Sequence, residues 1–160
     1  MKNSKILKLV SLVFVAVVQV CATEQINLSD LSDRIRQAQE SFYDLEDVFE
    51  GQNKSVSLAN QYLRTTQMLS DVVCEIIATI ARLPKAEAGD KYDKETDRES
   101  PQMELGYCCY GLLGNFEKLS PAESFGRDIL SRIDESDKSD IQHKYEEMEK
   151  KVNSAIHPDS

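Results

Sequence analysis

Residues 57–84 read SLANQYLRTTQMLSDVVCEIIATIARLP, and this stretch decides the fold. Its apolar residues recur at spacings of three and four, the period of a helix with one buried face. The stripe consists of Tyr62, Leu69, Val73, Ile76, Ile80 and Leu83, broadened by Val72 and Ile77. Ser55 or Ser57 can cap the start, and Pro84 cannot continue the helix. We therefore expect a helix about 40 Å long.

Three further stretches show the same period. A helix over residues 30–49 places six apolar residues within about 80° of one another, and Gly51 is its natural end. These residues are Leu31, Ile35, Ala38, Phe42, Leu45 and Phe49. A helix over 102–119 carries Leu105, Cys109, Leu112, Phe116 and Leu119. Ser120, Pro121 and Glu123 form a helix-start signal, followed by apolar residues at 125, 129 and 133 and then by a stripe over 141–156.

These patterns predict an all-α fold. No single amphipathic helix is stable alone, so we expect an up-and-down bundle of four main helices. The charged run 134–140 either splits the fourth helix or lies within it. Residues 85–100 are almost entirely polar and predict a long, mobile, charged surface loop between helices two and three. We expect residues 23–160 to form a single helical domain.

The first 22 residues are typical of a cleavable signal peptide. Lys2, Lys5 and Lys8 precede or enter an apolar run over 6–20, and Val20-Cys21-Ala22 suits a signal peptidase. We expect cleavage between Ala22 and Thr23, which predicts a secreted, extracellular protein without stable membrane insertion after cleavage. The alternative is a signal anchor, although no comparably apolar stretch follows.

The charge balance limits the classes of partner. The first 22 residues contain three lysines and no acidic residue, so residues 23–160 carry 16 basic and 28 acidic side chains, a net charge of −12. Such a chain repels phosphate backbones and anionic lipids. We therefore expect no nucleic-acid partner. A basic surface on a protein partner is compatible with this charge.

Three cysteines remain after residue 22, and an odd number in a secreted chain leaves one thiol over. Neighbouring cysteines in a regular helix point about 100° apart, so a bond between Cys108 and Cys109 is disfavoured. We predict a disulfide between Cys74 and Cys108, with Cys109 as a buried free thiol. The alternative pairs Cys74 with Cys109 and leaves Cys108 able to form a disulfide-linked homodimer.

Two Asn-x-Ser sequons, at Asn27 and Asn53, are candidate glycosylation sites at expected helix edges. No cofactor or metal site is expected, because His143 and His157 are the only histidines and neither has a zinc-type spacing to a cysteine. No serine or cysteine lies in a catalytic motif, so we do not expect an enzyme.

A second apolar face marks the helix over 102–119. Met103, Tyr107 and Tyr110 recur at i, i+4 and i+7, roughly opposite its main stripe. Tyrosine and methionine are enriched at binding interfaces, so these residues are candidate partner-binding residues. The alternative is that the face is packed within the domain.

These features together predict a secreted, non-enzymatic binding protein that acts through a helical surface on a protein partner. An extracellular ligand, an inhibitor and a salivary or venom-type effector all fit this description. The alternative is an extracellular carrier of a small apolar ligand, held between helices lined by Ile, Leu and Phe.

Overall fold

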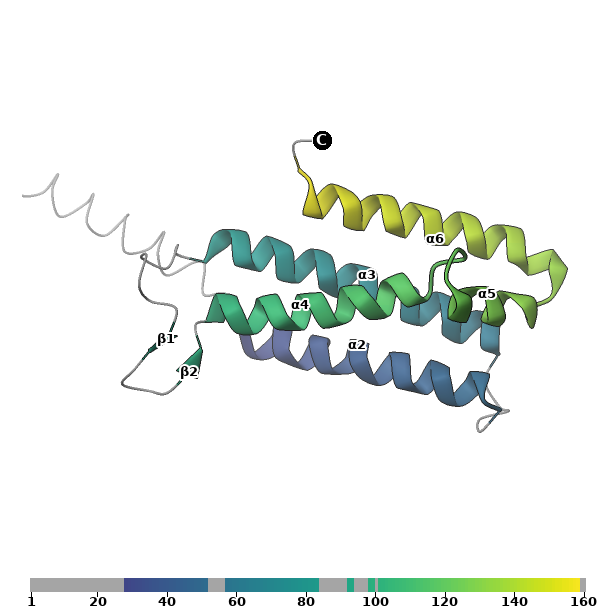
Figure 1. Ribbon diagram of the computed structural model, residues 1–160, viewed down its shortest axis with the longest axis horizontal. Helices are drawn as coiled ribbons and strands as arrows, with labels where there is room; N and C mark the ends of the chain where they lie inside the picture. The colour runs from purple at the N-terminus through teal and green to yellow at the C-terminus, as the bar shows by residue number, and fades with distance from the viewer. Residues whose placement is uncertain (1–27, 52–56, 84–91, 94–97, 100, 159–160) are drawn as a thin grey trace, which may run out of the picture.

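The computed structural model describes residues 28–51, 57–83, 92–93, 98–99 and 101–158. The described chain is predominantly helical, as the sequence predicts (Figure 1). Its helices are α2 (Leu28–Phe49), α3 (Leu58–Arg82), α4 (Pro101–Lys118), α5 (Ser124–Ser131) and α6 (Glu135–Ile156). No helix in these ranges has the length and apolar character needed to cross a lipid bilayer.

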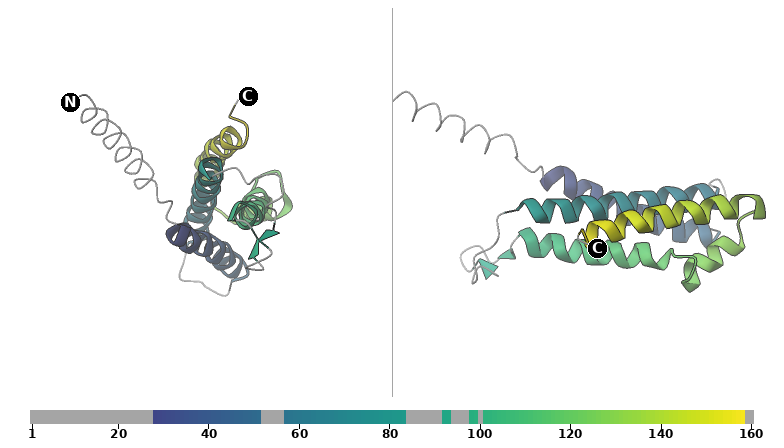
Figure 2. Two further views of the ribbon diagram at one scale, coloured as in Figure 1. Left: turned by 90° about the vertical axis from the view of Figure 1, so that its left-hand side faces the viewer. Right: turned by 90° about the horizontal axis from the view of Figure 1, so that it is seen from above.

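Helix α3 lies at the centre of the arrangement. It packs extensively against α2, α6 and α4, whereas α2 contacts α4 much less. Viewed end-on, α2, α3 and α6 lie in a row and α4 lies to one side (Figure 2). The chain reverses direction from α2 to α3, from α3 to α4 and again before α6 (Figure 1). Helix α4 therefore joins the bundle mainly through the side that packs against α3.

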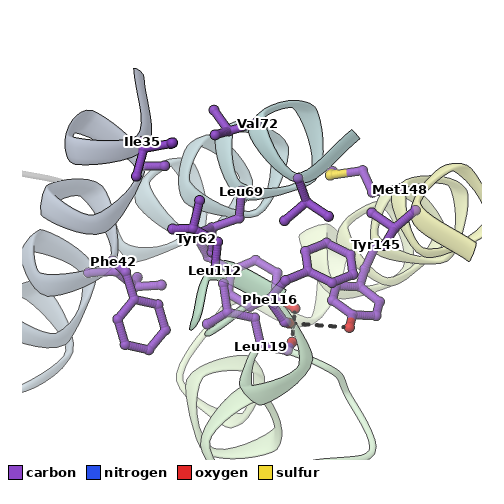
Figure 3. Packing of buried hydrophobic residues seen from close by; sticks show 14 of the residues in the cluster. Ile35, Phe42, Tyr62, Leu69, Val72, Leu112, Phe116, Leu119, Tyr145 and Met148 are labelled. Atoms are coloured by element: carbon purple, nitrogen blue, oxygen red, sulfur yellow. Dashed lines mark hydrogen bonds between the residues drawn. The ribbon is translucent and has the colours of Figure 1, made fainter. Parts of the chain in front are cut away.

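The core consists of the predicted apolar stripes, which meet around α3 (Figure 3). Two aromatic residues connect the elements. Tyr62 is fully buried on α3 and donates its hydroxyl to the carbonyl oxygen of Leu119 at 2.5 Å. Tyr145 of α6 stacks on Phe116 of α4, with ring centroids 5.1 Å apart. The Tyr145 hydroxyl donates to the carbonyl oxygen of Phe116 at 3.4 Å. Each tyrosine thus buries its ring while a main-chain acceptor satisfies its hydroxyl.

Polar side chains form part of the contact between α2 and α3, which the apolar pattern did not predict. The hydroxyls of Ser41 and Thr65 lie 2.8 Å apart, and Thr65 also donates to the carbonyl oxygen of Ser41 at 2.9 Å. The Gln61 amide donates to the same carbonyl oxygen at 3.4 Å. Buried polar groups need such partners, so these hydrogen bonds favour one register of α2 along α3.

The helix start expected at Ser120 is wrong. Residues 120–123 form a turn, in which the Glu123 amide donates to the carbonyl oxygen of Ser120 at 3.0 Å, and α5 begins at Ser124. Gly126 permits this turn, because a Cβ at this position would overlap the carbonyl oxygens of Leu119 and Ser120. The chain turns too tightly here for Ser120 to serve as the helix cap.

The break in the last helical stretch is shorter and earlier than residues 134–140. Helix α5 ends at Ser131, and α6 already begins at Glu135. Arg132 occupies the break, donating to the carbonyl oxygen of Phe49 at 2.7 Å, with its guanidinium 3.8 Å from the Phe49 ring centroid. This tertiary contact with the end of α2 locates the break.

The polar stretch expected between helices two and three contains two very short strands. Strand β1 (Tyr92–Asp93) pairs antiparallel with β2 (Arg98–Glu99), an element without a sequence signal because two residues show no alternation. The rest of residues 85–100, the predicted signal peptide over 1–22 and the candidate glycosylation sites Asn27 and Asn53 lie outside the described residues.

Candidate functional site

The outer side of α4 carries the two most exposed large hydrophobic residues of the described chain. Tyr110 exposes 82% of its surface and Tyr107 exposes 62%. Met103, one turn before Tyr107, is half-buried. The opposite side of the helix buries Leu105 and Leu112 in the core. We call the surface formed by Met103, Tyr107, Tyr110 and Gly114 the tyrosine face of α4.

Glycines make the surroundings of these tyrosines flat. A Cβ added at Gly106, Gly111 or Gly114 would meet no heavy atom within 4 Å beyond the local helix backbone and chain neighbours. No packing inside the domain therefore requires these glycines. Their effect is to leave backbone accessible beside two exposed phenol rings, so that a partner can approach the helix closely.

The charged residues next to the tyrosine face are mainly acidic. Glu104 and Glu117 are both exposed on α4. Lys118 turns toward α2, with its ammonium nitrogen 5.7 Å from the Phe42 ring centroid. The face therefore combines aromatic area and phenol hydroxyls with a negative border.

Among the described residues, Cys74, Cys108 and Cys109 are half-buried and carry free thiols, so the predicted bond between Cys74 and Cys108 stays a prediction. Cys74 lies at the contact of α3 with α6, where its sulfur is 3.9 Å from the carbonyl oxygen of Lys151. Burial raises the pKa of the Cys109 thiol, and the neighbouring Cys74 and Cys108 raise it further. Burial also raises the pKa of Cys74.

Cys108 points in another direction. It lines a recess of about 130 Å³ between α2 and α4, together with Leu28, Ser32, Ile35, Pro101, Glu104 and Leu105. Cys108 and Cys109 thus lie on different flanks of α4, as two successive residues of a regular helix must.

A larger recess of about 280 Å³ lies between α2 and α3 on the surface. It is lined by Arg34, Gln37, Arg64, Gln67, Met68, Asp71 and Val72. Two interhelical ion pairs flank it, Arg34 with Glu75 and Asp71 with Lys151, the latter at 2.6 Å. Sequence reasoning missed this recess, because it needs residues from two helices; the only local signal is the Gln67–Asp71 hydrogen bond at spacing i, i+4.

The remaining residues considered in the sequence analysis are the histidines. His143 lies 3.5 Å from Glu147 on the exposed side of α6. Over the described ranges, no group of three or more His, Cys, Asp or Glu side chains is arranged to hold a metal ion. The two histidines and the three cysteines therefore do not converge on one site.

No known protein-family model, curated protein or solved structure matches this chain.

Proposed function

We propose that this protein is a secreted, non-enzymatic binding protein whose tyrosine face contacts a protein partner. In this proposal the domain is a bundle of four main helices, the fourth of them split into α5 and α6. The protein acts on this partner as an extracellular ligand, an inhibitor or an effector of the salivary or venom type.

The exposure of Tyr107 and Tyr110 is the observation that carries the proposal. Large side chains on the outer side of a helix contribute nothing to the core, yet these two expose 62% and 82% of their surface. Tyrosine supplies a large, stiff contact area together with a hydroxyl that can donate or accept a hydrogen bond. Such residues are the usual anchors of protein interfaces.

The border of the face indicates the chemistry of the partner. Glu104 and Glu117 are exposed beside the tyrosines, and the whole chain carries a net charge of −9. A complementary surface therefore has pockets for two phenol rings and basic side chains around them. Opposite charge at the border raises the association rate, and added salt lowers that rate.

The alternative, a carrier of a small apolar ligand, has less support. The recess between α2 and α3 has charged and amide side chains in its lining, including Arg34, Arg64 and Asp71. A site for an apolar ligand is lined mainly by hydrophobic side chains with a few polar groups. The recess also opens at the surface, not between the apolar faces of the core.

A photo-cross-linking experiment tests the tyrosine face. A photoreactive phenylalanine replaces Tyr110 in one variant and Tyr43 in another; Tyr43 is the matched control because it exposes 61% of its surface on α2. In extracellular fluid from the source tissue, we expect the variant at position 110 to capture a discrete protein. Capture of the same protein from position 43, or capture from neither position, would contradict the proposal.

The affinity for the captured protein then measures how much the two tyrosines contribute to binding. Replacing Tyr107 and Tyr110 by serine removes both anchors, and we expect affinity to fall by about 30-fold or more. Tyr43→Ser should leave affinity unchanged. Circular dichroism and a thermal melt confirm that each variant is folded.

Secretion is tested separately. The full chain is expressed in a eukaryotic cell and the culture medium is analysed by N-terminal sequencing. We expect a chain beginning at Thr23. Treatment with an amidase that removes N-linked glycans should reduce its mass if Asn27 or Asn53 is glycosylated. A chain retained in the cell membrane would contradict the proposal and support the signal anchor.

A further inference from the structure

We propose that the recess between α2 and α3 binds a small amphipathic organic anion, and that Arg64 holds its anionic group. The ligand is a carboxylate or sulfonate carried on an apolar body of one or two rings. Helix α4 contributes no residue to the lining, so this site is separate from the tyrosine face and does not depend on the partner of that face.

Two donor side chains in the lining have no partner inside the described part of the protein. The Arg64 guanidinium on α3 and the Gln37 carboxamide on α2 form no hydrogen bond or ion pair with any described residue. The chain has 28 acidic and 19 basic residues, yet no carboxylate engages this guanidinium. A guanidinium presents paired N–H groups that match the oxygens of a carboxylate or sulfonate. Arg64 is therefore available to an anion from outside.

The other charged groups of the lining are already compensated. Arg34 forms an ion pair with Glu75, and the Asp71 carboxylate accepts a hydrogen bond from Lys151 at 2.6 Å. With these two pairs neutral, the charge that remains at the recess is positive and belongs to Arg64. This local charge opposes the net charge of −9 of the whole chain, so it is specific to the recess.

Apolar side chains provide the second part of the site. Val72 is fully buried and Met68, one turn before it, is half-buried, and both line the recess. Covering such surfaces with an apolar ring removes them from water, which stabilises the complex. The volume of about 280 Å³ is slightly below the roughly 300–1,000 Å³ of sites for drug-sized ligands, which restricts the ligand to one or two rings.

The order of these residues along α3 fixes how the ligand lies. Arg64, Met68 and Val72 follow one another at intervals of four residues, so they share one side of the helix. Each interval corresponds to about 6 Å along the helix axis. An aromatic carboxylate can therefore pair with Arg64 while its rings lie over Met68, with Gln37 of α2 on the opposite wall.

Isothermal titration calorimetry with three probes tests the ligand class. We expect the purified protein to bind 2-naphthoate at least about tenfold more tightly than the neutral 2-naphthalenemethanol, which lacks the charge, or inorganic sulfate, which lacks the apolar body. Equal affinity for either comparison probe would overturn the proposal, because it would show that charge or apolar area alone is recognised. The absence of 2-naphthoate binding at millimolar concentration would overturn it as well.

Matched variants test the role of Arg64. Arg64→Gln should weaken 2-naphthoate binding by about tenfold. Arg36→Gln is the control, because it removes the same charge from the exposed side of α2, where Arg36 pairs with Glu40. This control should leave the affinity unchanged, and an equal loss in both variants would overturn the assignment of Arg64. Circular dichroism confirms that each variant is folded.

A third variant and a spectroscopic readout test the position of the rings. Met68→Gln keeps the length of the side chain but removes its apolar end, so we expect about threefold weaker binding. In ¹H–¹⁵N spectra of the wild type, 2-naphthoate should shift amide signals of α2 and α3 around the recess. Shifts confined to α4 or α6, or unchanged affinity in Met68→Gln, would overturn the proposed site.

Discussion

At the scale of single residues, the hydroxyls of Ser41 and Thr65 between α2 and α3 matter because they are buried and paired with each other. Thr65 is fully buried and shares hydrogen bonds with both the hydroxyl and the carbonyl oxygen of Ser41. Ser70 is equally buried on α3, but its hydroxyl has no hydrogen-bond partner in the described part of the chain. The loss of a paired hydroxyl leaves its partner unsatisfied, whereas the loss of an unpaired one does not.

We therefore expect Thr65→Val to lower the free energy of unfolding by about 1–3 kcal/mol, because Ser41 loses its partner in a buried site. Ser70→Ala is the matched control and should change it by less than about 1 kcal/mol. Urea denaturation followed by circular dichroism measures both. The double variant Ser41→Ala/Thr65→Val should cost less than the sum of the single variants. Strict additivity would show that the two hydroxyls are not coupled.

At the scale of elements, the helix ends depend on glycines in different ways. Gly51 has a φ of +81°, so it ends α2 in the left-handed conformation that the sequence predicts. Gly126 has an ordinary helical position in α5 but faces the carbonyl oxygens of Leu119 and Ser120 across the tight turn. Gly114 lies in α4 with open space around it. Glycine is thus required at position 51 by the backbone conformation and at position 126 by a close approach of main-chain atoms. At position 114 packing does not require it.

Alanine substitutions separate the last two cases. Gly126→Ala should lower the free energy of unfolding by about 1–3 kcal/mol, because its Cβ would collide with main-chain atoms that cannot move aside easily. Gly114→Ala should instead raise it by about 0.5–1 kcal/mol, since alanine favours the helix and nothing obstructs its side chain. Thermal melts of both variants give the comparison. A stabilising effect at position 126 would show that the turn is looser than described.

At the scale of the whole molecule, ion pairs connect the outer helices to α3. The Lys151 ammonium of α6 donates to Asp71 of α3 at 2.6 Å, and Gln67 donates to the same carboxyl oxygen at 2.9 Å. Burial acts to raise the pKa of Asp71, but the hydrogen bonds from Lys151 and Gln67 outweigh it and lower that pKa. The same hydrogen bond raises the pKa of Lys151.

The sign of the pH dependence follows from the lowered pKa of Asp71. The folded state binds this proton less tightly than the unfolded state, so the contribution of the pair is present above about pH 4 and is lost as the pH falls further. We expect Asp71→Asn to lower the free energy of unfolding by about 0.2–1 kcal/mol at pH 7 and low salt, and by less at pH 3. Added salt should also reduce the difference.

The control for this prediction is Asp44→Asn, which removes an exposed carboxylate from α2 without touching the contact between α3 and α6. Urea denaturation at pH 7 and pH 3 compares the two variants. A difference between Asp71→Asn and the wild type that stays constant over this range would show that the pair does not titrate as described.

The sequence by itself determined the all-helical character, most of the buried stripes and the end of α2 just before Gly51, because helical periodicity and glycine conformation are properties of neighbouring residues. It also singled out Met103, Tyr107 and Tyr110, but α4 is apolar on two sides and its pattern could not say which side faces α3.

Only the tertiary structure decided that Tyr107 and Tyr110 are exposed, that Cys74 lies against α6 and that α5 begins after a turn instead of at Ser120. Each of these depends on which helices touch and how they are rotated about their axes. Those quantities are set by contacts between residues far apart in the chain, such as Tyr62 with Leu119 or Arg132 with Phe49. A local sequence pattern therefore does not predict them.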